Sequence, residues 1–205
     1  MKAPLNAPTG YVGDTAFKAF LKRVECPAPF HVVRMRFLGA IASPVDETSP
    51  VRVIQSFWLE DDQPDLATME DAGAFFDTFI GLWNRQAKPE GSSQVRLTRF
   101  KISRSAGDVE QCLLIRLEEI EDGFVEGFWA GRDDLDMSAT AAGLIDLVGE
   151  TAGQYAELIG AMQDLGKLSQ HGARDLSQAI SKYDGVAERA IRELLRLRRK
   201  SRRRI

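Results

Sequence analysis

Three acidic side chains on one helical face are the first candidates for chemistry. Glu118, Asp122 and Glu126 are spaced at i, i+4 and i+8, which places them on the same side of a helix. Such a face could hold a divalent cation if a second helix supplied matching acids and a Glu-x-x-His pair. The chain supplies no such pair. We therefore interpret this face as solvated surface, with a metal site or a docking face for a basic partner as the alternatives.

The histidines and cysteines predict no reactive centre. His31 has no acid or nucleophile at motif spacing, so a surface or capping role is favoured over that of a general base, and His171 is read in the same way. Cys26 and Cys112 lie far apart and in no metal-ligand spacing, which favours two reduced, partly buried thiols. No nucleophile elbow, phosphate-binding loop or dinucleotide fingerprint occurs. We predict no catalytic, cofactor-binding or metal-binding residues. The remaining enzyme hypothesis is a site without linear signature around Glu118–Glu126.

A cluster of basic residues at the C-terminal end is the strongest functional signal. Residues 189–205 carry nine Arg or Lys and one acid, so they hold a formal charge of +8, against −11 for residues 1–188. Such an asymmetry is typical of an interaction arm, although a frayed, solubilising end, or one folded back onto the acidic body, is the plain alternative. The cluster could bind an acidic protein, the phosphates of a nucleic acid, or less plausibly an anionic membrane. The predicted partner-binding residues are Arg196, Arg198, Arg199, Lys200, Arg202, Arg203 and Arg204.

Helical periodicity extends over most of the chain and defines the elements that must position these residues. The clearest helix is 67–87, whose predicted inward stripe is Met69, Ala72, Phe76, Phe79, Ile80 and Trp83. Residues 93–103 break the helical pattern and suggest an extended stretch. The other expected helices are one from Asp14 that stops at Cys26, 29–42, one from Pro50, 109–131, 138–164 and a last one from about Asp175.

Three glycines recur every four residues near the end of the helix expected at 109–131. Gly123, Gly127 and Gly131 would form a ridge that lets a second helix approach closely, at a helix-propensity cost of about 1 kcal/mol each. After a predicted hinge at 166–173, the last helix carries apolar residues over more than half of its surface. That breadth suggests a homodimer formed through this helix.

Three stretches resemble the YecA/YgfB-like family of bacterial all-helical proteins. They are FLGAIASPVDETSP (Phe37 to Pro50), AFFDTFIGLWNRQA (Ala74 to Ala87) and EDGFVEGFWAGRDDL (Glu121 to Leu135). The likeness covers about residues 14–165 and implies a helical fold with a regulatory or adaptor role. Members often carry a C-terminal cysteine-rich metal motif similar to that of the SecA translocase. This chain has an arginine cluster in its place, so the resemblance implies no metal-binding tail.

Together these observations predict an all-α, multi-helix bundle of about six to seven helices with one irregular or short extended segment around 93–103. We expect a loose lead at 1–13, a YecA/YgfB-like helical domain at 14–165, and a hinge plus basic helix at 166–205. No apolar run approaches the roughly 20 residues that span a bilayer, and no secretory signal is seen, so we expect a cytoplasmic protein. The predicted function is that of a non-catalytic adaptor or regulator that contacts an unidentified protein. The alternative is a nucleic-acid- or ribosome-associated protein that uses the arginine cluster.

Overall fold

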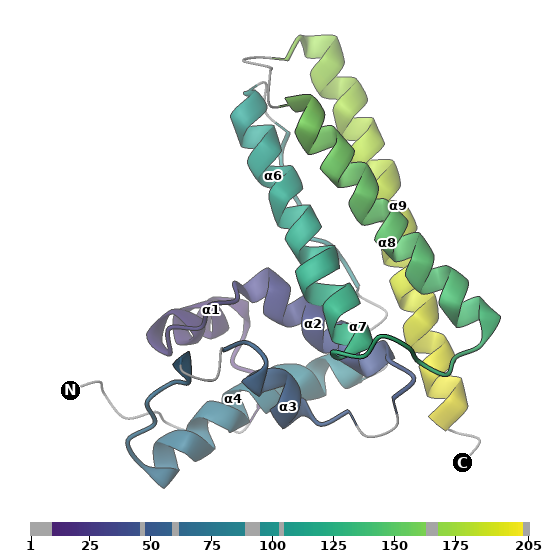
Figure 1. Ribbon diagram of the computed structural model, residues 1–205. Coiled ribbons are helices and arrows are strands. Elements are labelled where there is room, and N and C mark those ends of the chain that lie inside the picture. The colour runs from purple at the N-terminus through teal and green to yellow at the C-terminus, as the bar shows by residue number, and fades with distance from the viewer. Residues whose placement is uncertain are drawn as a thin grey trace.

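A computed structural model describes residues 10–45, 48–58, 62–88, 95–102, 105–162 and 168–202. The chain is an all-α, multi-helix bundle, which confirms the predicted fold class. Figure 1 shows two parts: a lower layer that contains the first four labelled helices, and an upright bundle of the later helices that stands on it. Among the described residues no helix is both long and apolar enough to cross a membrane.

The lower layer is held together by aromatic side chains. It contains α1 (Asp14–Arg23), α2 (Phe30–Ala42), α3 (Pro50–Gln55) and α4 (Met69–Ala87). Phe79 of α4 is fully buried at its centre, and its ring lies 5.5 Å from Phe17 and 5.3 Å from Phe20, centroid to centroid. Rings at such distances, packed edge to face, add stabilisation beyond the area that they bury. Two of the predicted helix starts agree closely with the structure. Pro50 lies in the first turn of α3, and the side chain of Thr68 caps α4.

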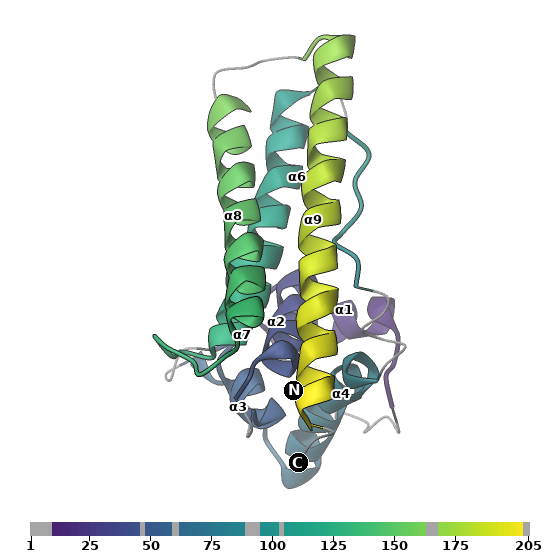
Figure 2. The same cartoon turned by 90° about the vertical axis from the view of Figure 1, so that its right-hand side faces the viewer.

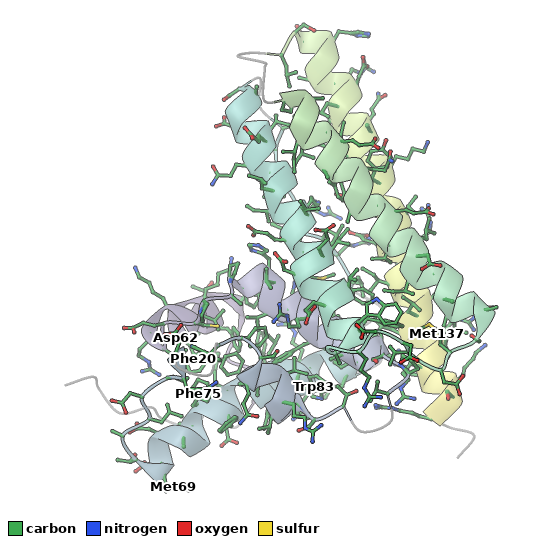
Figure 3. All side chains as sticks on the ribbon, viewed as in Figure 1. Phe20, Asp62, Met69, Phe75, Trp83 and Met137 are labelled. Carbon is green, nitrogen blue, oxygen red and sulfur yellow. The ribbon has the colours of Figure 1, made fainter. Side chains whose placement is uncertain are left out.

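The inward stripe of α4 differs from the prediction. Met69, expected in the core, is 88% exposed at the tip of the helix, far from Trp83 (Figure 3). Phe75 and Leu82, which the prediction omitted, are buried, whereas Phe76 and Trp83 are only half-buried. The buried face of α4 is therefore rotated by about one residue from the predicted stripe, so that Phe75 and Leu82 lie inward together with Phe79.

The helix expected at 109–131 has three parts. α6 (Ala106–Glu118) is capped by Ser105, whose side chain accepts from the Asp108 amide. It continues into a π-helical segment, η2 (Glu119–Val125), and then α7 (Glu126–Trp129). A π turn holds more residues than an α turn and so rotates the following side chains. As a result Glu119, Ile120, Gly123 and Phe124 all lie inward.

Glycines allow α2 to lie directly against η2 and α7. A Cβ placed on Gly127 would lie 2.2 Å from the carbonyl oxygen of Arg36, and one on Gly123 would lie 2.6 Å from Cβ of Met35. Gly39 of α2, which the sequence did not single out, faces them and is closer still: a Cβ there would lie 2.1 Å from the carbonyl oxygen of Phe124. Both Gly123 and Gly127 are thus confirmed as packing glycines.

Gly131 is not a packing glycine, and that prediction was wrong. The helix ends at Trp129, and Gly131 follows with a φ of +71° in an open position where an added Cβ would meet no atom within 4 Å. Its neighbour Ala130 also has a positive φ, of 51°. The two residues turn the chain away from α7, a role that suits glycine because it lacks a Cβ.

The upright bundle consists of α6, η2 and α7 together with α8 (Ala139–Met162) and α9 (Gln170–Arg202), as Figure 2 shows. α9 begins five residues before the predicted start, so the described residues 170–173 of the expected hinge are helical. The five residues 163–167 lie outside the described chain. α9 packs along α8 and also reaches α2 in the lower layer.

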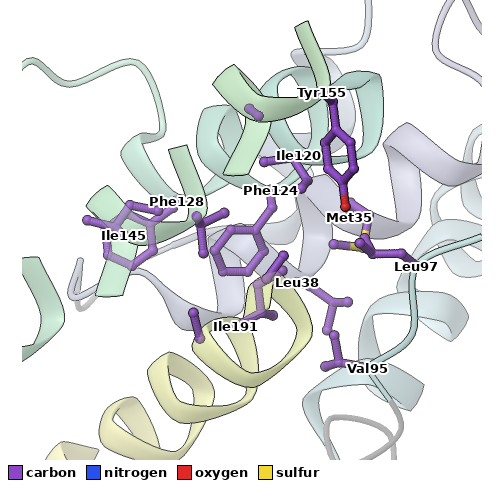
Figure 4. Close-up of a cluster of buried hydrophobic side chains, with 14 of the residues drawn as sticks. Met35, Leu38, Val95, Leu97, Ile120, Phe124, Phe128, Ile145, Tyr155 and Ile191 are labelled. Atoms are coloured by element: carbon purple, nitrogen blue, oxygen red, sulfur yellow. The ribbon is translucent and has the colours of Figure 1, made fainter. Parts of the chain in front are cut away.

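One hydrophobic cluster joins the bundle to α2. Phe124, Phe128, Ile145, Tyr155 and Ile191 come from four helices and meet over α2, as the close-up in Figure 4 shows. Ile191, Leu194 and Leu195 of α9 are buried in this cluster, so the apolar face that suggested a homodimer is covered by the chain itself. The predicted domain boundary at 166 therefore does not divide the chain into two parts with separate hydrophobic cores.

Residues 95–102 form an extended segment beside the bundle, within the stretch predicted at 93–103. Its described residues belong to no strand. The segment runs up the bundle next to α9 in Figure 2. Val95 and Leu97 are buried in the main cluster, and Ile102 packs against it. It therefore covers an apolar groove of the bundle without forming a sheet.

Candidate functional site

The predicted basic cluster does not form one exposed face. Arg196 is bound to Glu193 on the same helix through Nε, at 2.6 Å, and Nη2. Arg198 is only 7% exposed, and its Nη2 donates to the carbonyl oxygen of Val45 at 2.8 Å. Arg198 therefore ties α9 to the chain after α2, which corrects its assignment to an exposed partner-binding face.

The remaining cations lie closer to solvent. Arg199 is half-buried and donates to the carbonyl oxygen of Lys88 at 3.2 Å, whereas Lys200 and Arg202 are exposed. Arg203 and Arg204 lie outside the described residues. Within the described residues no carboxylate forms a salt bridge with Lys200. Lys200 and Arg202 thus place exposed positive charge at the last turn of α9.

A hollow opens beside this last turn, and we call it the C-terminal groove. It has a volume of about 630 Å³ and lies between the end of α9, the start of α8 and the end of α2. Met137, which lines it, lies at the foot of the bundle beside α8 and α9 in Figure 3. Its apolar lining is Ala42, Phe128, Met137, Ala141, Leu194 and Leu197, and its polar lining includes Asp136, Ser138, Arg198, Lys200 and Ser201.

The groove combines an apolar floor with charged edges. Met137 and Leu197 are half-buried and supply the accessible apolar surface, while Phe128 and Leu194 are core residues that lie beneath it. Lys200 stands exposed at one edge. Concave apolar sites with a few polar groups at fixed positions are typical of places where ligands and peptide side chains bind.

A buried polar network lies higher in the bundle and was not predicted. Arg116 of α6 donates from Nε and Nη2 to the two carboxylate oxygens of Asp184 in α9, at 2.8 and 2.7 Å. Its Nη1 donates to Glu119 at 2.9 Å. The hydroxyl of Tyr155 donates to Asp184 at 2.6 Å. A bidentate pair of this kind fixes α6, α8 and α9 in one register.

The network also fixes the extended segment. The fully buried Glu119 accepts from the backbone and hydroxyl of Thr98 and from Arg34 of α2, at 2.7 to 3.0 Å. In the same way Glu188 of α9 accepts from the amide of Leu97 at 3.0 Å and from Arg96 at 2.7 Å. Carboxylates of two helices thus provide hydrogen-bond partners for a backbone that has no neighbouring strand.

The ionisation of this network follows from its surroundings. Burial, together with the charge and hydrogen bond of Asp184, raises the pKa of Tyr155 far above its ordinary value, so the phenol stays neutral. Burial alone would lower the pKa of Arg116, but the hydrogen bonds and charge of Asp184 and the charge of Glu119 raise it. A cleft of about 400 Å³ lies alongside. Its acids Asp184 and Glu188 are already bonded to arginines, so they serve the packing of the bundle.

The predicted acidic face does not form a cluster of ligands. Glu118 lies 2.7 Å from Nε2 of His31, and Asp122 and Glu126 are exposed. Within the described parts of the chain, no group of three or more His, Cys, Asp or Glu side chains is arranged to hold a metal ion. His171 lies in the first turn of α9, 3.3 Å from Asp175, and both are exposed.

The two cysteines are free and half-buried, as predicted. Burial raises the pKa of Cys26 to about 11 and also raises that of Cys112. Because the thiolate is the reactive form, both thiols are weak nucleophiles at neutral pH.

Comparisons with protein-family models, with curated proteins and with solved structures found no match for this chain. The resemblance to the YecA/YgfB-like family therefore stays a prediction.

Proposed function

We propose that this protein is a non-catalytic adaptor or regulator whose C-terminal groove binds a short segment of a partner protein. The occupant would carry large apolar side chains flanked by Asp or Glu. The observation that carries the proposal is the groove itself, an apolar hollow of about 630 Å³ beside the cations of the last turn of α9.

The apolar floor supports a partner with anchoring side chains. Met137 and Leu197, which are half-buried, contribute apolar surface from the chain before α8 and from α9. An aromatic or aliphatic side chain that enters the groove would gain about 1.5–3 kcal/mol from its burial. Anchors of this kind account for most of the affinity in typical protein interfaces.

The charges around the groove support an acidic partner. Arg198, Lys200 and Asp136 line the groove and leave it a formal charge of +1, and Arg202 is exposed one turn or less further along α9. The negative end of the helix dipole is compatible with these cations. Opposite charges at the rim of an interface accelerate association and select the partner more than they add affinity.

Nucleic-acid binding is the alternative, and two observations count against it. Arg196 is paired with Glu193, and Arg198 is buried, so neither presents a free guanidinium to a phosphate. The groove floor is apolar, whereas a phosphate backbone needs a continuous basic surface. The two free thiols fit a reducing compartment, so we propose that the protein acts in the cytoplasm.

A peptide-display selection against the purified protein tests the proposal. We expect the enriched peptides to combine large apolar residues with Asp or Glu. For a synthetic peptide of this type, Leu197→Asp and Lys200→Glu should each weaken binding about tenfold or more, measured by fluorescence anisotropy.

Matched variants outside the groove serve as controls. Leu114 of α6 is 41% exposed and Lys182 of α9 is exposed, so Leu114→Asp and Lys182→Glu make the same chemical changes elsewhere. The proposal fails if all four variants bind the peptide equally, or if no peptide is enriched. If a single-stranded RNA binds and Lys200→Glu abolishes that binding, the nucleic-acid alternative replaces it.

A further inference from the structure

A second cavity, separate from the C-terminal groove, gathers three arginines. It has a volume of about 250 Å³ and lies between α2, the start of α3 and the chain that follows α7. We call it the arginine pocket. Its polar lining consists of Arg36, Arg52, Arg132, Ser49, Thr48 and Ser56, together with Glu126.

Local backbone geometry brings the third arginine into this pocket. Ala130 and Gly131 both have a positive φ, which reverses the chain directly after α7. The amide of Arg132 then donates to the carbonyl oxygen of Trp129 at 3.1 Å, which closes the turn. Arg132 therefore lines the same cavity as Arg52 of α3, although 80 positions separate them in the sequence.

Arg36 is a partly buried cation whose hydrogen-bond acceptors are all neutral. Its Nε and Nη2 donate to the carbonyl oxygen of Asp122 at 2.9 and 2.7 Å, and its Nη1 donates to that of Ser56 at 3.3 Å. The guanidinium lies over the ring of Phe57, 5.2 Å from its centroid. Among the described residues no carboxylate lies within salt-bridge distance of Arg36. Burial lowers its pKa, which reflects the cost of an incompletely compensated cation.

The other donors of the pocket are also available. Arg52 and Arg132 are exposed, and no side-chain hydrogen bond or salt bridge engages either of them among the described residues. The hydroxyl of Ser49 does not cap α3. The hydroxyls of Thr48 and Ser56, in contrast, donate to the carbonyl oxygens of Val45 and Val53. Two guanidinium groups, the unused N–H groups of Arg36 and one hydroxyl can therefore donate to a ligand.

The charge and size of the pocket define the ligand. Three guanidinium groups against the carboxylate of Glu126 leave a formal charge of +2. This charge matches a phosphate monoester, which is close to dianionic at neutral pH and has three strong acceptor oxygens. Arginine binds such a group through paired N–H donors. A volume of about 250 Å³ is below the usual range of drug-sized sites, so only a small molecule fits.

We propose that the arginine pocket binds the phosphate group of a small phosphomonoester through Arg36, Arg52 and Arg132. The guanidinium of Arg36 supplies a fixed cation at the base, because three hydrogen bonds to carbonyl oxygens hold it. Arg52 and Arg132 close on the phosphate from α3 and from the turn after α7. This site is independent of the partner-binding groove and can be present whether or not the groove binds a peptide.

Calorimetric titration of the full chain with inorganic phosphate and with glycerol 3-phosphate, at constant ionic strength, tests this proposal. We expect saturable binding of one ligand per chain. Arg52→Gln combined with Arg132→Gln should weaken binding at least about tenfold, since the charge-assisted hydrogen bonds of two guanidinium groups are lost. Both residues are exposed, so the fold should be retained, and each single variant gives the same readout on a less altered protein.

The matched control removes the same charge elsewhere. Arg174 and Arg189 are exposed on α9 and outside the pocket, so Arg174→Gln with Arg189→Gln should leave phosphate affinity unchanged. Equal weakening by this control, or no saturable phosphate binding by the unaltered chain, overturns the proposal. Tighter binding of malonate would replace the phosphate with a small dicarboxylate. Tighter binding of a phosphoserine peptide would contradict the assignment to a small molecule.

Discussion

At the scale of single residues, Gly39 has the closest surroundings of the glycines that the structure describes. An added Cβ would lie 2.1 Å from the carbonyl oxygen of Phe124 and 2.7 Å from the amide nitrogen of Phe128. Both obstacles are backbone, so η2 and α7 would have to move away from α2. We expect Gly39→Ala to lower the free energy of unfolding by about 3 kcal/mol or more, measured by urea denaturation.

Gly143 of α8 provides the matched control for this substitution. It is exposed, and an added Cβ would meet no atom within 4 Å. Gly143→Ala should raise the free energy of unfolding by up to about 1 kcal/mol, because alanine is the better helix former. Similar effects of the two substitutions would show that α2 does not approach η2 as closely as described.

The raised pKa of Tyr155 predicts how the stability of the protein changes at alkaline pH. Its pKa is raised by burial and by Asp184, so the folded chain keeps the phenolic proton that the unfolded chain loses near pH 10. The stabilising contribution is therefore complete below pH 10 and is lost as the pH rises further. The slope from this group is at most about 1.36 kcal/mol per pH unit.

The variant Tyr155→Phe isolates this effect. At pH 7 we expect it to be less stable by about 1 kcal/mol, because the hydrogen bond to Asp184 is lost. Above pH 10 the variant should lose stability less steeply than the unaltered chain, so the two denaturation midpoints should converge. Tyr11, whose pKa burial also raises, contributes equally to both proteins. Parallel curves up to pH 11.5 would exclude a neutral, buried Tyr155.

Part of the buried network could have been predicted from single residues. Arg116 lies three residues after Leu113 and four before Ile120, so a charge stands on an otherwise apolar stripe. Asp184 lies four residues after Ile180 and three before Ala187, so it also interrupts an apolar stripe. A charged residue on an inward stripe requires a partner, and these two are each other's partners. Their pairing itself could not be predicted, because 68 residues separate them and only the packing of α6 on α9 brings them together.

At the scale of elements, the extended segment 95–102 is the part of the fold that depends most on side-chain hydrogen bonds. The amide of Leu97 donates to Glu188, and that of Thr98 donates to Glu119. We expect Glu188→Ala to accelerate hydrogen exchange of the Leu97 amide. Hydrogen bonds to charged groups contribute about 1.5–3 kcal/mol, so the acceleration should be tenfold or more.

Glu193 of the same helix is the control for this prediction. Among the described residues its carboxylate is bonded to Arg196 on α9 and to no part of the extended segment. Glu193→Ala should therefore leave exchange of the Leu97 amide unchanged. If both variants accelerate it equally, the segment is held by its apolar residues and not by the carboxylates.

Most helices, but not all their boundaries, could be predicted from the periodicity of apolar residues. α2 runs from Phe30 to Ala42, within a residue of the expected range, because proline and serine mark its ends. The π-helical segment was missed, since Leu113, Ile120 and Phe124 fit one continuous α-helical stripe. The rotation that it introduces is imposed by contact with α2 through Gly123, which no local pattern encodes.

At the scale of the whole molecule, α9 is part of the core and not an appendage. Ala187, Ile191, Leu194 and Leu195 are all buried in the cluster that includes Phe124. Large apolar side chains contribute about 1.5–3 kcal/mol each when buried, against a total stability of about 5–15 kcal/mol for typical domains. We expect a chain that ends at Gly185 to lose cooperative thermal unfolding, followed by circular dichroism.

A shorter truncation, which leaves the buried residues of α9 in place, is the control for this prediction. A chain that ends at Ser201 keeps every buried residue of α9 and should unfold near the temperature of the intact protein. If the chain that ends at Gly185 folds, α9 is not required for the core, and the predicted domain boundary at 166 stands.

For a related reason, the C-terminal groove could not be predicted from the sequence. Its lining comes from α2, α7, α8 and α9, and the residues concerned are apolar positions that resemble any other core position. The basic cluster made the end of α9 a candidate site, but only the structure separates Arg198, which is buried, from Lys200, which is exposed.

The most direct test of the account is a methyl NMR titration of the protein with the acidic, apolar peptide obtained from display. Binding in the C-terminal groove predicts shift changes concentrated on Met137, Leu194 and Leu197, with Leu114 and the residues of α1 unaffected. Shift changes centred on any other surface, or spread evenly over the molecule, would contradict a docking function for this groove.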